Sequence, residues 1–229
     1  NLSTSTKESD KYSILVDGNA PIFGETTTVK KGTSEVVKEG NIYYVNGGVS
    51  VAFDITEGNL KSVKVKEGNG TLSETGITKA LKTGSATDWT VTYNWTGEKV
   101  LTFEAEDENE NKKEKVVTLY YDKELPAVDS FEVSPDYISK SGDTKKYLNG
   151  IVKFTGAVSD NDKIKNLKVT AGSTVLYNGD ASGFTETFDT TLVSNGDLKI
   201  TFEATDRAGN KKTDNTTYVF YVDQGTDKP

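Results

Sequence analysis

Residues 199–213, KITFEATDRAGNKKT, closely match residues 100–114, VLTFEAEDENENKKE. The shared positions recur at a constant offset of 99 residues (202 − 103): Phe103, Ala105, Asp107 and Asn111 match Phe202, Ala204, Asp206 and Asn210. A second stretch, 43–65, matches 146–169 at an offset of 103 to 104. Similarity at a fixed period indicates a tandem array of structural modules. The sequence therefore predicts two copies of one unit.

The ends of the units also match one another. The segments LVDGNAP (15–21), YYDKELP (120–126) and YVDQGTDKP (221–229) place an aspartate at 17, 122 and 223, with spacings of 105 (122 − 17) and 101 (223 − 122) residues. We expect a first domain at 18–122, a second at 123–223, a tail at 1–17 that resembles the last strand of a preceding repeat, and a linker stub at 224–229. The chain has no starting Met, and we expect it to be a segment of a longer array.

Each unit reads as a series of short β-strands. Apolar residues alternate with polar ones at Val49, Val51, Phe53 and Ile55, and at Ile200, Phe202 and Ala204, which places them on one face of a strand. Asn46-Gly47 and Asn149-Gly150 predict tight hairpin turns, and residues 75–82 predict a single helical turn. About seven short strands per hundred residues, without alternating helices, indicate an all-β fold made of two-sheet sandwiches.

Several motifs resemble those of bacterial immunoglobulin-like (Big-type) repeats. They are VNG before a strand, GAVSDNDKI (156–164), ATDRAGN (204–210) and a junction Asp followed by Pro. The resemblance implies two tandem immunoglobulin-like, Greek-key sandwiches, and the chain has no Cys and so no disulfides. In such repeats AGN forms the F–G turn, where Gly209 adopts a left-handed conformation. The first unit has Glu110 there, so we expect its turn to differ and to use Asn109 or Asn111 instead.

Composition excludes several functions. The net charge is −8 and every basic residue except Arg207 is Lys, which argues against nucleic-acid binding. The absence of Cys and His removes thiol nucleophiles, the commonest general base and the usual zinc ligands. The acids lie in turn-like stretches of mixed charge, and no nucleophile elbow or phosphate-binding Gly loop is present, so we expect no enzyme. No apolar run is long enough to span a membrane.

A calcium site at the middle junction is one hypothesis. In the implied topology the chain enters each sandwich at the end that carries the B–C and F–G loops. The acids expected there are Asp122 and Glu124 from the linker, Asp160 and Asp162 from B–C, and Asp206 from F–G. Ca²⁺ takes six to eight oxygen ligands, which such a cluster would supply, and several related arrays use calcium at junctions.

Turn capping is the alternative explanation of the same acids. Asp122, Asp162 and Asp206 are each followed by a base, and Asp caps turns through its own backbone. In the first unit the loop DITEGN (54–59) has Glu57 in place of Asp160, so calcium is less expected there. We expect no required cofactor.

Aromatic residues suggest a different ligand. Trp95, Tyr43 and Tyr44 would form a sugar-stacking surface if their rings were exposed. The alternative places Trp89, Val91 and Tyr93 on the inner face of one strand, with Trp95 at the same parity. The second unit has Phe188 and Leu192 at the positions aligned with Trp89 and Tyr93, as core positions would.

The expected function is that of a non-catalytic extracellular module of a bacterial surface protein, acting as a stalk, a spacer or an adhesive segment. A carbohydrate-binding accessory module of a secreted enzyme and a surface-layer structural domain are the alternatives. The expected partners are neighbouring immunoglobulin-like repeats of the same chain and a host protein or glycan, and we expect a monomer.

Overall fold

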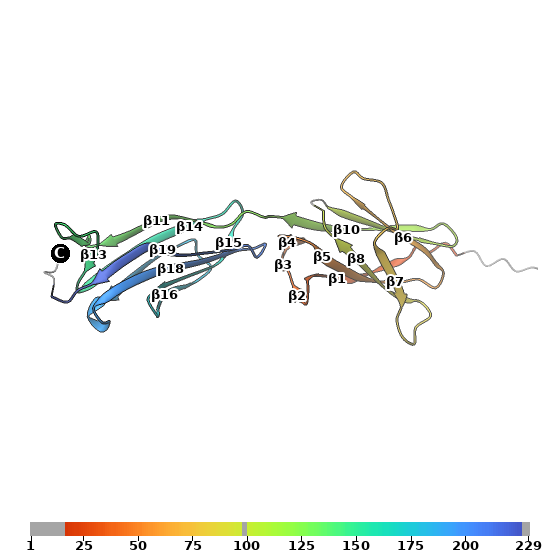
Figure 1. Cartoon of the computed structure of the whole chain (residues 1–229). Helices are drawn as coiled ribbons and strands as arrows, with labels where there is room; N and C mark the ends of the chain where they lie inside the picture. Colours follow the sequence, from red (N-terminus) through yellow and green to blue (C-terminus); the bar gives the residue numbers. More distant parts are fainter. Residues whose placement is uncertain (1–16, 98–99, 226–229) are drawn as a thin grey trace, which may run out of the picture. The chain divides into compact units, whose positions relative to one another are not determined.

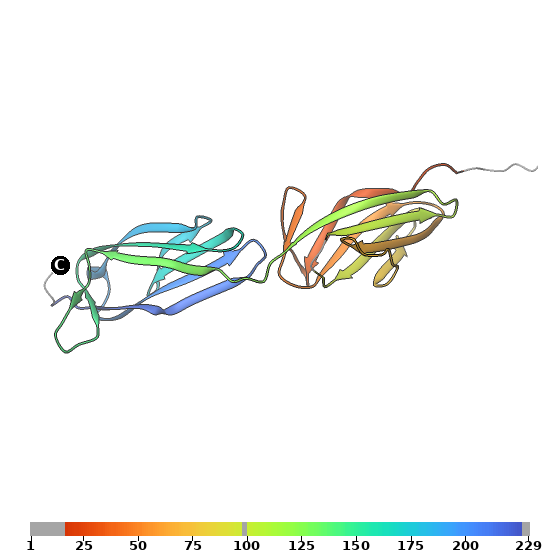
Figure 2. The same cartoon turned by 90° about the horizontal axis from the view of Figure 1, so that it is seen from above.

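The computed structural model describes residues 17–97 and 100–225, and these form β-strands joined by loops, with one short 3₁₀ helix. The strands make four sheets, which pair into two sandwiches (Figure 1, with the same strands seen from above in Figure 2). Residues 1–16 of the predicted tail and residues 226–229 of the linker stub lie outside the described residues. Within the described part of the chain, no helix is long and apolar enough to cross a membrane.

The first sandwich contains strands β1 to β10. One sheet has the order β2-β1-β5-β8-β7, with bounds β1 Ile22–Lys31, β2 Ser34–Glu35, β5 Val49–Thr56, β7 Ile77–Leu81 and β8 Asp88–Trp95. The other has the order β3-β4-β10-β9-β6, with bounds β3 Val37–Glu39, β4 Ile42–Val45, β6 Leu60–Glu67, β9 Leu101–Asp107 and β10 Lys112–Tyr121.

Aromatic rings from both sheets meet in the core of the first sandwich. The ring centroids of Phe53 on β5 and Phe103 on β9 are 4.7 Å apart in an edge-to-face arrangement. Tyr93 on β8 packs against Phe103 in the same way, with centroids 5.9 Å apart. The alternation predicted for 49–55 is confirmed, because all four of its apolar residues are buried.

The second sandwich contains strands β11 to β19. A three-stranded sheet has the order β11-β14-β17, with bounds β11 Ala127–Ser134, β14 Ile151–Ser159 and β17 Gly183–Asp189. A six-stranded sheet has the order β12-β13-β19-β18-β15-β16, with bounds β12 Ile138–Ser139, β13 Lys146–Leu148, β15 Ile164–Ala171, β16 Thr174–Gly179, β18 Gly196–Asp206 and β19 Lys211–Val222. The 3₁₀ helix η1 covers Thr190–Leu192.

The second core repeats the first. Phe202 on β18 is buried with Phe154 on β14 and Phe220 on β19, in a cluster that draws on both sheets. Phe202 lies 99 positions after Phe103, and both side chains are almost completely inaccessible to solvent. The prediction of two sandwiches with equivalent cores is therefore confirmed.

The predicted hairpins at the two Asn-Gly pairs are wrong. Asn46-Gly47 joins β4 to β5, and Asn149-Gly150 joins β13 to β14, and in both cases the two strands belong to different sheets. Each strand before the Asn-Gly pair instead runs parallel to the last strand of its sandwich. The register pairs residues 42–45 with 118–121 and residues 147–148 with 221–222. The Asn-Gly pairs thus carry the chain from one layer to the other.

Three local predictions are also wrong. The segment predicted to be a helical turn forms strand β7, which pairs with β8. Leu192, aligned with core residue Tyr93, lies in η1 and is 81% exposed, because strand β17 ends before it. Glu110 adopts the left-handed conformation itself (φ +65°), like Gly209 (φ +89°), so the first turn does not avoid it.

The chain divides into two compact units. One is formed by 17–28, 51–94 and 101–116, and the other by 29–50, 95–97, 100 and 117–225. The domain boundaries expected from the repeat, 18–122 and 123–223, remain a prediction.

Candidate functional site

Three carboxylates meet where the chain leads into the second sandwich. Asp122 follows β10, Asp160 follows β14, and Asp206 is the last residue of β18. One carboxylate oxygen from each lies within 4.8 Å of the others, and all three residues belong to the same compact unit. We call this group the second acid cluster. Strand ends position all three side chains, so the sheet framework fixes their separation.

Asp206 closes the turn after β18. Its Oδ1 accepts the backbone N–H of Asn210 at 2.8 Å, and its Oδ2 accepts the side-chain Nδ2 of Asn210 at 2.7 Å. The backbone N–H of Asp206 donates to the carbonyl of Asn210 at 3.1 Å. Gly209 supplies the positive φ that this tight turn requires. Both oxygens of Asp206 therefore have donors, which supports turn capping at this residue.

Asp122 is only partly satisfied, although it is 3% exposed. Its Oδ1 accepts the backbone N–H of Glu124 at 2.8 Å and the Nδ2 of Asn161 at 3.2 Å. Its Oδ2 is buried and has no hydrogen-bond partner among the described residues. Buried polar atoms nearly always have a partner, so this oxygen is exceptional.

Asp160 also has one buried carboxylate oxygen without a hydrogen-bond partner among the described residues. Its Oδ1 accepts the backbone N–H of Asp162 at 3.1 Å, whereas its Oδ2 is buried and has no partner in the described part of the chain. Burial raises the pKa of the Asp160 carboxyl, because desolvation disfavours the charged form. The backbone N–H of Asp162 opposes this rise, while the nearby carboxylates of Asp206 and Asp122 add to it. Two oxygens of the cluster thus lie in an environment that does not stabilise their charge.

Two of the five residues predicted for the site are elsewhere. The carboxylate of Asp162 accepts both Nε of Arg207, at 2.8 Å, and Nη2 of Arg207. These bonds raise the pKa of the Arg207 guanidinium above its ordinary value. Glu124 is exposed, and it reaches the cluster only through its backbone N–H. The structure therefore brings together Asp122, Asp160 and Asp206, and it does not bring Asp162 or Glu124 to them.

The first sandwich has a corresponding group, the first acid cluster, made of Asp17, Glu57 and Asp107. One oxygen of each lies within 4.8 Å of the others, although the sequence made such a site less expected here. Asp107 Oδ1 accepts the backbone N–H groups of Asn109 and Asn111, at 2.9 and 2.8 Å, and its Oδ2 accepts the Nδ2 of Asn111 at 2.8 Å. Asp17 was missed because it was assigned to the tail, although its recurrence at 122 was a usable signal.

Hydrogen bonds lower the pKa of the Asp107 carboxyl. Burial acts to raise the pKa of this carboxyl, but the bonds from Asn111 and Asn109 outweigh burial and leave the pKa below its ordinary value. Asp17 and Glu57 are only half-buried, and each accepts a backbone N–H two residues further on. In the described residues, no oxygen of the first acid cluster is both buried and unpartnered.

The predicted sugar-stacking residues are buried. Trp95 is 0% exposed, and Tyr43 and Tyr44 are each 6% exposed. The ring of Trp95 packs edge-to-face against Tyr121 with centroids 5.9 Å apart. These residues present no exposed ring for a sugar, which favours the interior alternative stated for Trp95.

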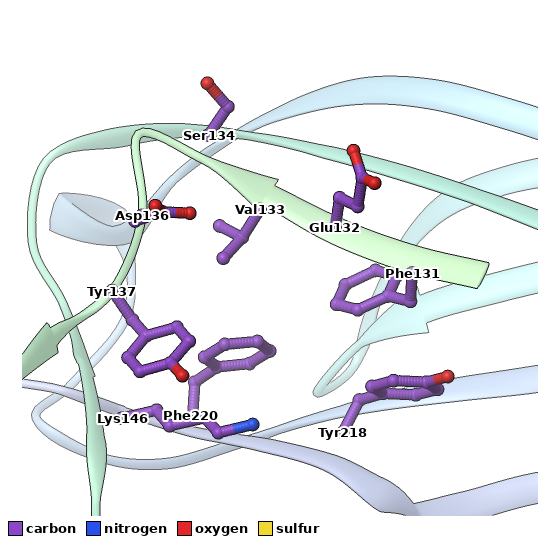
Figure 3. A pocket seen from close by; sticks show the side chains of 9 residues that line it. All are labelled: Phe131, Glu132, Val133, Ser134, Asp136, Tyr137, Lys146, Tyr218 and Phe220. Carbon is purple, nitrogen blue, oxygen red and sulfur yellow. The ribbon is translucent and has the colours of Figure 1, made fainter.

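A pocket of about 590 Å³ opens beside β11 in the second sandwich (Figure 3). Phe131, Tyr137, Tyr218 and Phe220 point toward it, whereas the side chain of Glu132 points away from it. The rings of Phe131 and Tyr218 are 4.7 Å apart, and the ammonium of Lys146 lies 5.1 Å from the centre of the Tyr137 ring. The sequence did not single out these residues as a site, because Phe131, Tyr218 and Phe220 lie on strands and look like ordinary core positions.

Comparison with known proteins finds structural neighbours of low sequence identity. No protein-family model matches the chain, and no curated protein sequence matches it. The fibronectin(III)-like modules of Clostridium thermocellum CbhA are 14% identical with a TM-score of 0.43, and the match covers 87% of this chain and 94% of that one. Titin domains A168–A170 are 12% identical with a TM-score of 0.45, covering 89% of this chain and 64% of that one.

The sheet orders show two β-sandwiches in tandem, each made of two sheets. A fold of this kind accommodates many functions, so the functional argument depends on the junctions and the acid clusters.

Proposed function

We propose that this chain is a non-catalytic stalk or spacer segment of an extracellular bacterial surface protein, built from Big-type repeats. The observation that carries the proposal is the bonding of the junction aspartate. The backbone N–H of Asp122 donates to the carbonyl of Val45 at 2.9 Å, and its own carbonyl accepts the Nδ2 of Asn210 at 3.1 Å. One residue therefore combines a bond to strand β4 of the first sandwich with a bond to the turn between β18 and β19 of the second.

One of these two bonds is found at Asp17 and the other at Asp223, the aspartates that match Asp122 in the repeat. The carbonyl of Asp17 accepts the Nδ2 of Asn111 at 2.9 Å, and the N–H of Asp223 donates to the carbonyl of Leu148 at 3.2 Å. Each unit thus has the same bonding at its start and at its end, which supports modules that follow one another in series. Short, fixed junctions suit a spacer, because a stalk must limit bending between neighbours.

The experiment that tests the spacer is a scattering measurement of the junction. Asn210→Ala removes the bond to the Asp122 carbonyl, and we expect it to broaden the distribution of maximum dimensions in small-angle X-ray scattering. Asn111→Ala removes the matching bond at Asp17 and serves as the control, since Asp17 does not join the two units. Equal distributions for the wild type and Asn210→Ala would remove the support for a fixed junction.

A binding panel separates the spacer from an adhesin or surface-layer domain. A pure spacer binds nothing in a panel of host extracellular proteins and glycans. Saturable binding to a host protein would replace the spacer proposal with an adhesive one. Concentration-dependent self-association in sedimentation experiments would favour the surface-layer alternative over the expected monomer.

A carbohydrate-binding accessory module remains the second candidate, now for a different reason. The pocket beside β11 gathers four aromatic rings, and Tyr137 is 38% exposed there. Aromatic faces stack on sugar rings, and the other ring groups would limit the orientation of a bound sugar. Glycan binding that is lost in Tyr137→Ala but kept in Tyr177→Ala would support this candidate.

A further inference from the structure

Among the described strands, β17 forms an uncovered edge of the three-stranded sheet in the second sandwich. It pairs with β14 over its whole length, residues 183–189 with 151–157, without a register shift. By contrast β11, at the other edge of this sheet, has an irregularity between Val128 and Ser130. β17 contains neither Pro nor Lys, two residues with which proteins protect edge strands. A regular, unprotected edge offers its backbone N–H and C=O groups to another extended strand.

The first sandwich covers the equivalent edge with a strand of its own. In the sheet orders, β8 follows β5 as β17 follows β14. Beyond β8 lies β7, which pairs antiparallel with it from Ile77↔Tyr93 to Leu81↔Trp89. In the second sandwich the segment before β17 forms β16, which belongs to the other sheet. Strand β17 therefore lacks the covering strand that its counterpart in the repeat has.

An apolar groove of about 450 Å³ lies beside the uncovered edge. Residues of β16 and β17 form its walls, and the buried ring of Phe188 contributes to its lining. Ile151, Val175 and Leu192 also line it, and they are 67%, 53% and 81% exposed. Exposed apolar side chains that gather in one place indicate a binding surface, whereas scattered ones do not. A strand added to β17 would cover part of this surface.

Glu186 determines which kind of strand fits. It lines the groove, and in the strand alternation it lies between Phe184 and Phe188, which are both buried. Its side chain is exposed, and no ion pair joins it to another described residue. In an added strand, the residue opposite Glu186 faces the same side of the sheet, where an opposite charge is favourable. Residues two positions away on that strand face the same side, and beside the groove they should be apolar.

We propose that β17 binds an extended peptide segment of another protein by antiparallel strand addition, with a Lys or Arg opposite Glu186 and an apolar residue two positions away in the groove. Strand β7 has this pattern, because Ile77, Lys79 and Leu81 share one face. The Nζ of Lys79 donates to the carbonyl of Lys61 on β6, in the opposite sheet, at 2.7 Å. Backbone hydrogen bonds supply the affinity of such a complex, and the side chains on alternate positions supply its selectivity.

The docking edge goes beyond the stalk proposal and is independent of it. A stalk segment can carry a docking edge for a second protein, and the junction measured by scattering does not include β17. Failure of either proposal therefore leaves the other unchanged.

The test uses the full 229-residue chain and a labelled synthetic peptide with the sequence of residues 74–84, ETGITKALKTG. This peptide contains the strand that covers the equivalent edge in the first sandwich. We expect saturable binding in fluorescence anisotropy, and changes of backbone amide NMR shifts that are confined to β17 and the groove. A peptide in which residues 78 and 79 are exchanged is the control, since it places the Lys on the opposite face and should bind more weakly.

Matched variants test the contacts. Glu186→Lys should weaken binding about five-fold or more, because it replaces an opposite-charge pair with a like-charge pair, and a peptide with Lys79→Glu should restore it. Leu192→Ala should weaken binding about three-fold or more, because it removes apolar area beside the groove. Val116→Ala, at an exposed apolar residue of the first sandwich, is the control and should bind like the wild type. Melting curves confirm that each variant is folded.

Three results would overturn the proposal. The first is the absence of saturable peptide binding at concentrations up to about 1 mM. The second is equal affinity of the wild type, Glu186→Lys and Leu192→Ala for the peptide. The third is self-association of the chain in sedimentation experiments that Glu186→Lys and Leu192→Ala abolish, which would assign the edge to a second copy of this chain.

Discussion

The two acid clusters occupy equivalent places in the repeat and differ in how their charge is satisfied. In each, an Asp at the end of a strand accepts an Asn backbone N–H and side chain four residues later: Asp107 with Asn111, and Asp206 with Asn210. The remaining acids differ in burial, since Asp17 and Glu57 are half-buried whereas Asp122 is almost fully buried. The turn is thus a structural feature of the repeat, and the burial of Asp122, where the first copy has the half-buried Asp17, is what distinguishes one copy from the other.

The largest expected effect tests whether the cores of the two sandwiches are equivalent. Phe103→Ala and Phe202→Ala should each destabilise their own sandwich by about 3–5 kcal/mol, the usual cost of deleting a buried Phe. Each should leave the other transition almost unchanged in differential scanning calorimetry. Thr102→Ala and Thr201→Ala, on the opposite strand face, are the controls and should cost much less. Similar losses from the Thr and Phe variants would contradict the strand register.

The next effect separates the two capping aspartates. Asp107→Asn turns an amide donor toward the Nδ2 of Asn111, and we expect the Tm of the first sandwich to fall by roughly 5 °C or more. Asp206→Asn creates the same conflict, but it also removes one charge from beside Asp122 and Asp160. Its Tm loss should therefore be smaller than that of Asp107→Asn. A larger Tm loss in Asp206→Asn would show that the three carboxylates of the second acid cluster do not destabilise one another.

The turn residues themselves give a smaller contrast. Gly209→Ala places a side chain in a left-handed conformation and should cost about 1–2 kcal/mol in the second sandwich. Glu110→Gly removes the strain of the left-handed conformation in the first sandwich. The greater flexibility of Gly in the unfolded chain cancels part of this gain, so we expect a net stabilisation of about 0.5–1 kcal/mol. Urea unfolding measures both. Destabilisation by Glu110→Gly would mean that the Glu side chain makes a contact that outweighs the backbone strain.

The smallest contrast is the contribution of Glu106 to the acid dependence of the first sandwich, which has no counterpart at the equivalent position of the second. The hydrogen bond from Lys61 lowers the pKa of Glu106 from 4.5 to about 2; burial opposes this shift, and Lys112 adds to it. The equivalent residue of the second sandwich, at position 205, is Thr. A lowered folded pKa contributes stability above the unfolded value, and this stability is lost as the pH falls from about 4.5 toward 2. Glu106→Gln should flatten the acid limb of the first transition, while Glu203→Gln, an exposed pair with Lys211, should not. Parallel acid limbs for the wild type and Glu106→Gln would contradict this assignment.

Much of the fold was predictable because it depends on local patterns. Alternation identified the buried faces, and the repeat identified Phe103 with Phe202 and Asp107 with Asp206. The sheet to which each strand belongs was not predictable from Asn-Gly, since the same dipeptide serves a hairpin or a change of layer. The exposure of Leu192 was missed because an apolar residue beyond the end of a strand resembles one within it.

The candidate site was predicted in part for the same reason. The sequence grouped Asp122, Asp160 and Asp206, which follow strand ends that the topology brings to one place. It could not exclude Asp162, whose carboxylate forms bonds with Arg207, 45 residues away along the chain. The two unpartnered oxygens result from how three distant segments pack, and no local pattern encodes them.

The parallel pairing of β4 with β10, and of β13 with β19, has a mechanical consequence. Tension applied along the polypeptide draws the earlier strand of each pair toward the N-terminus and the later strand toward the C-terminus. Because the strands are parallel, the load acts along them, so their hydrogen bonds are sheared together rather than opened one at a time. The pairing covers four residues per strand in the first sandwich and two in the second. Under a pulling force the second sandwich should therefore yield first.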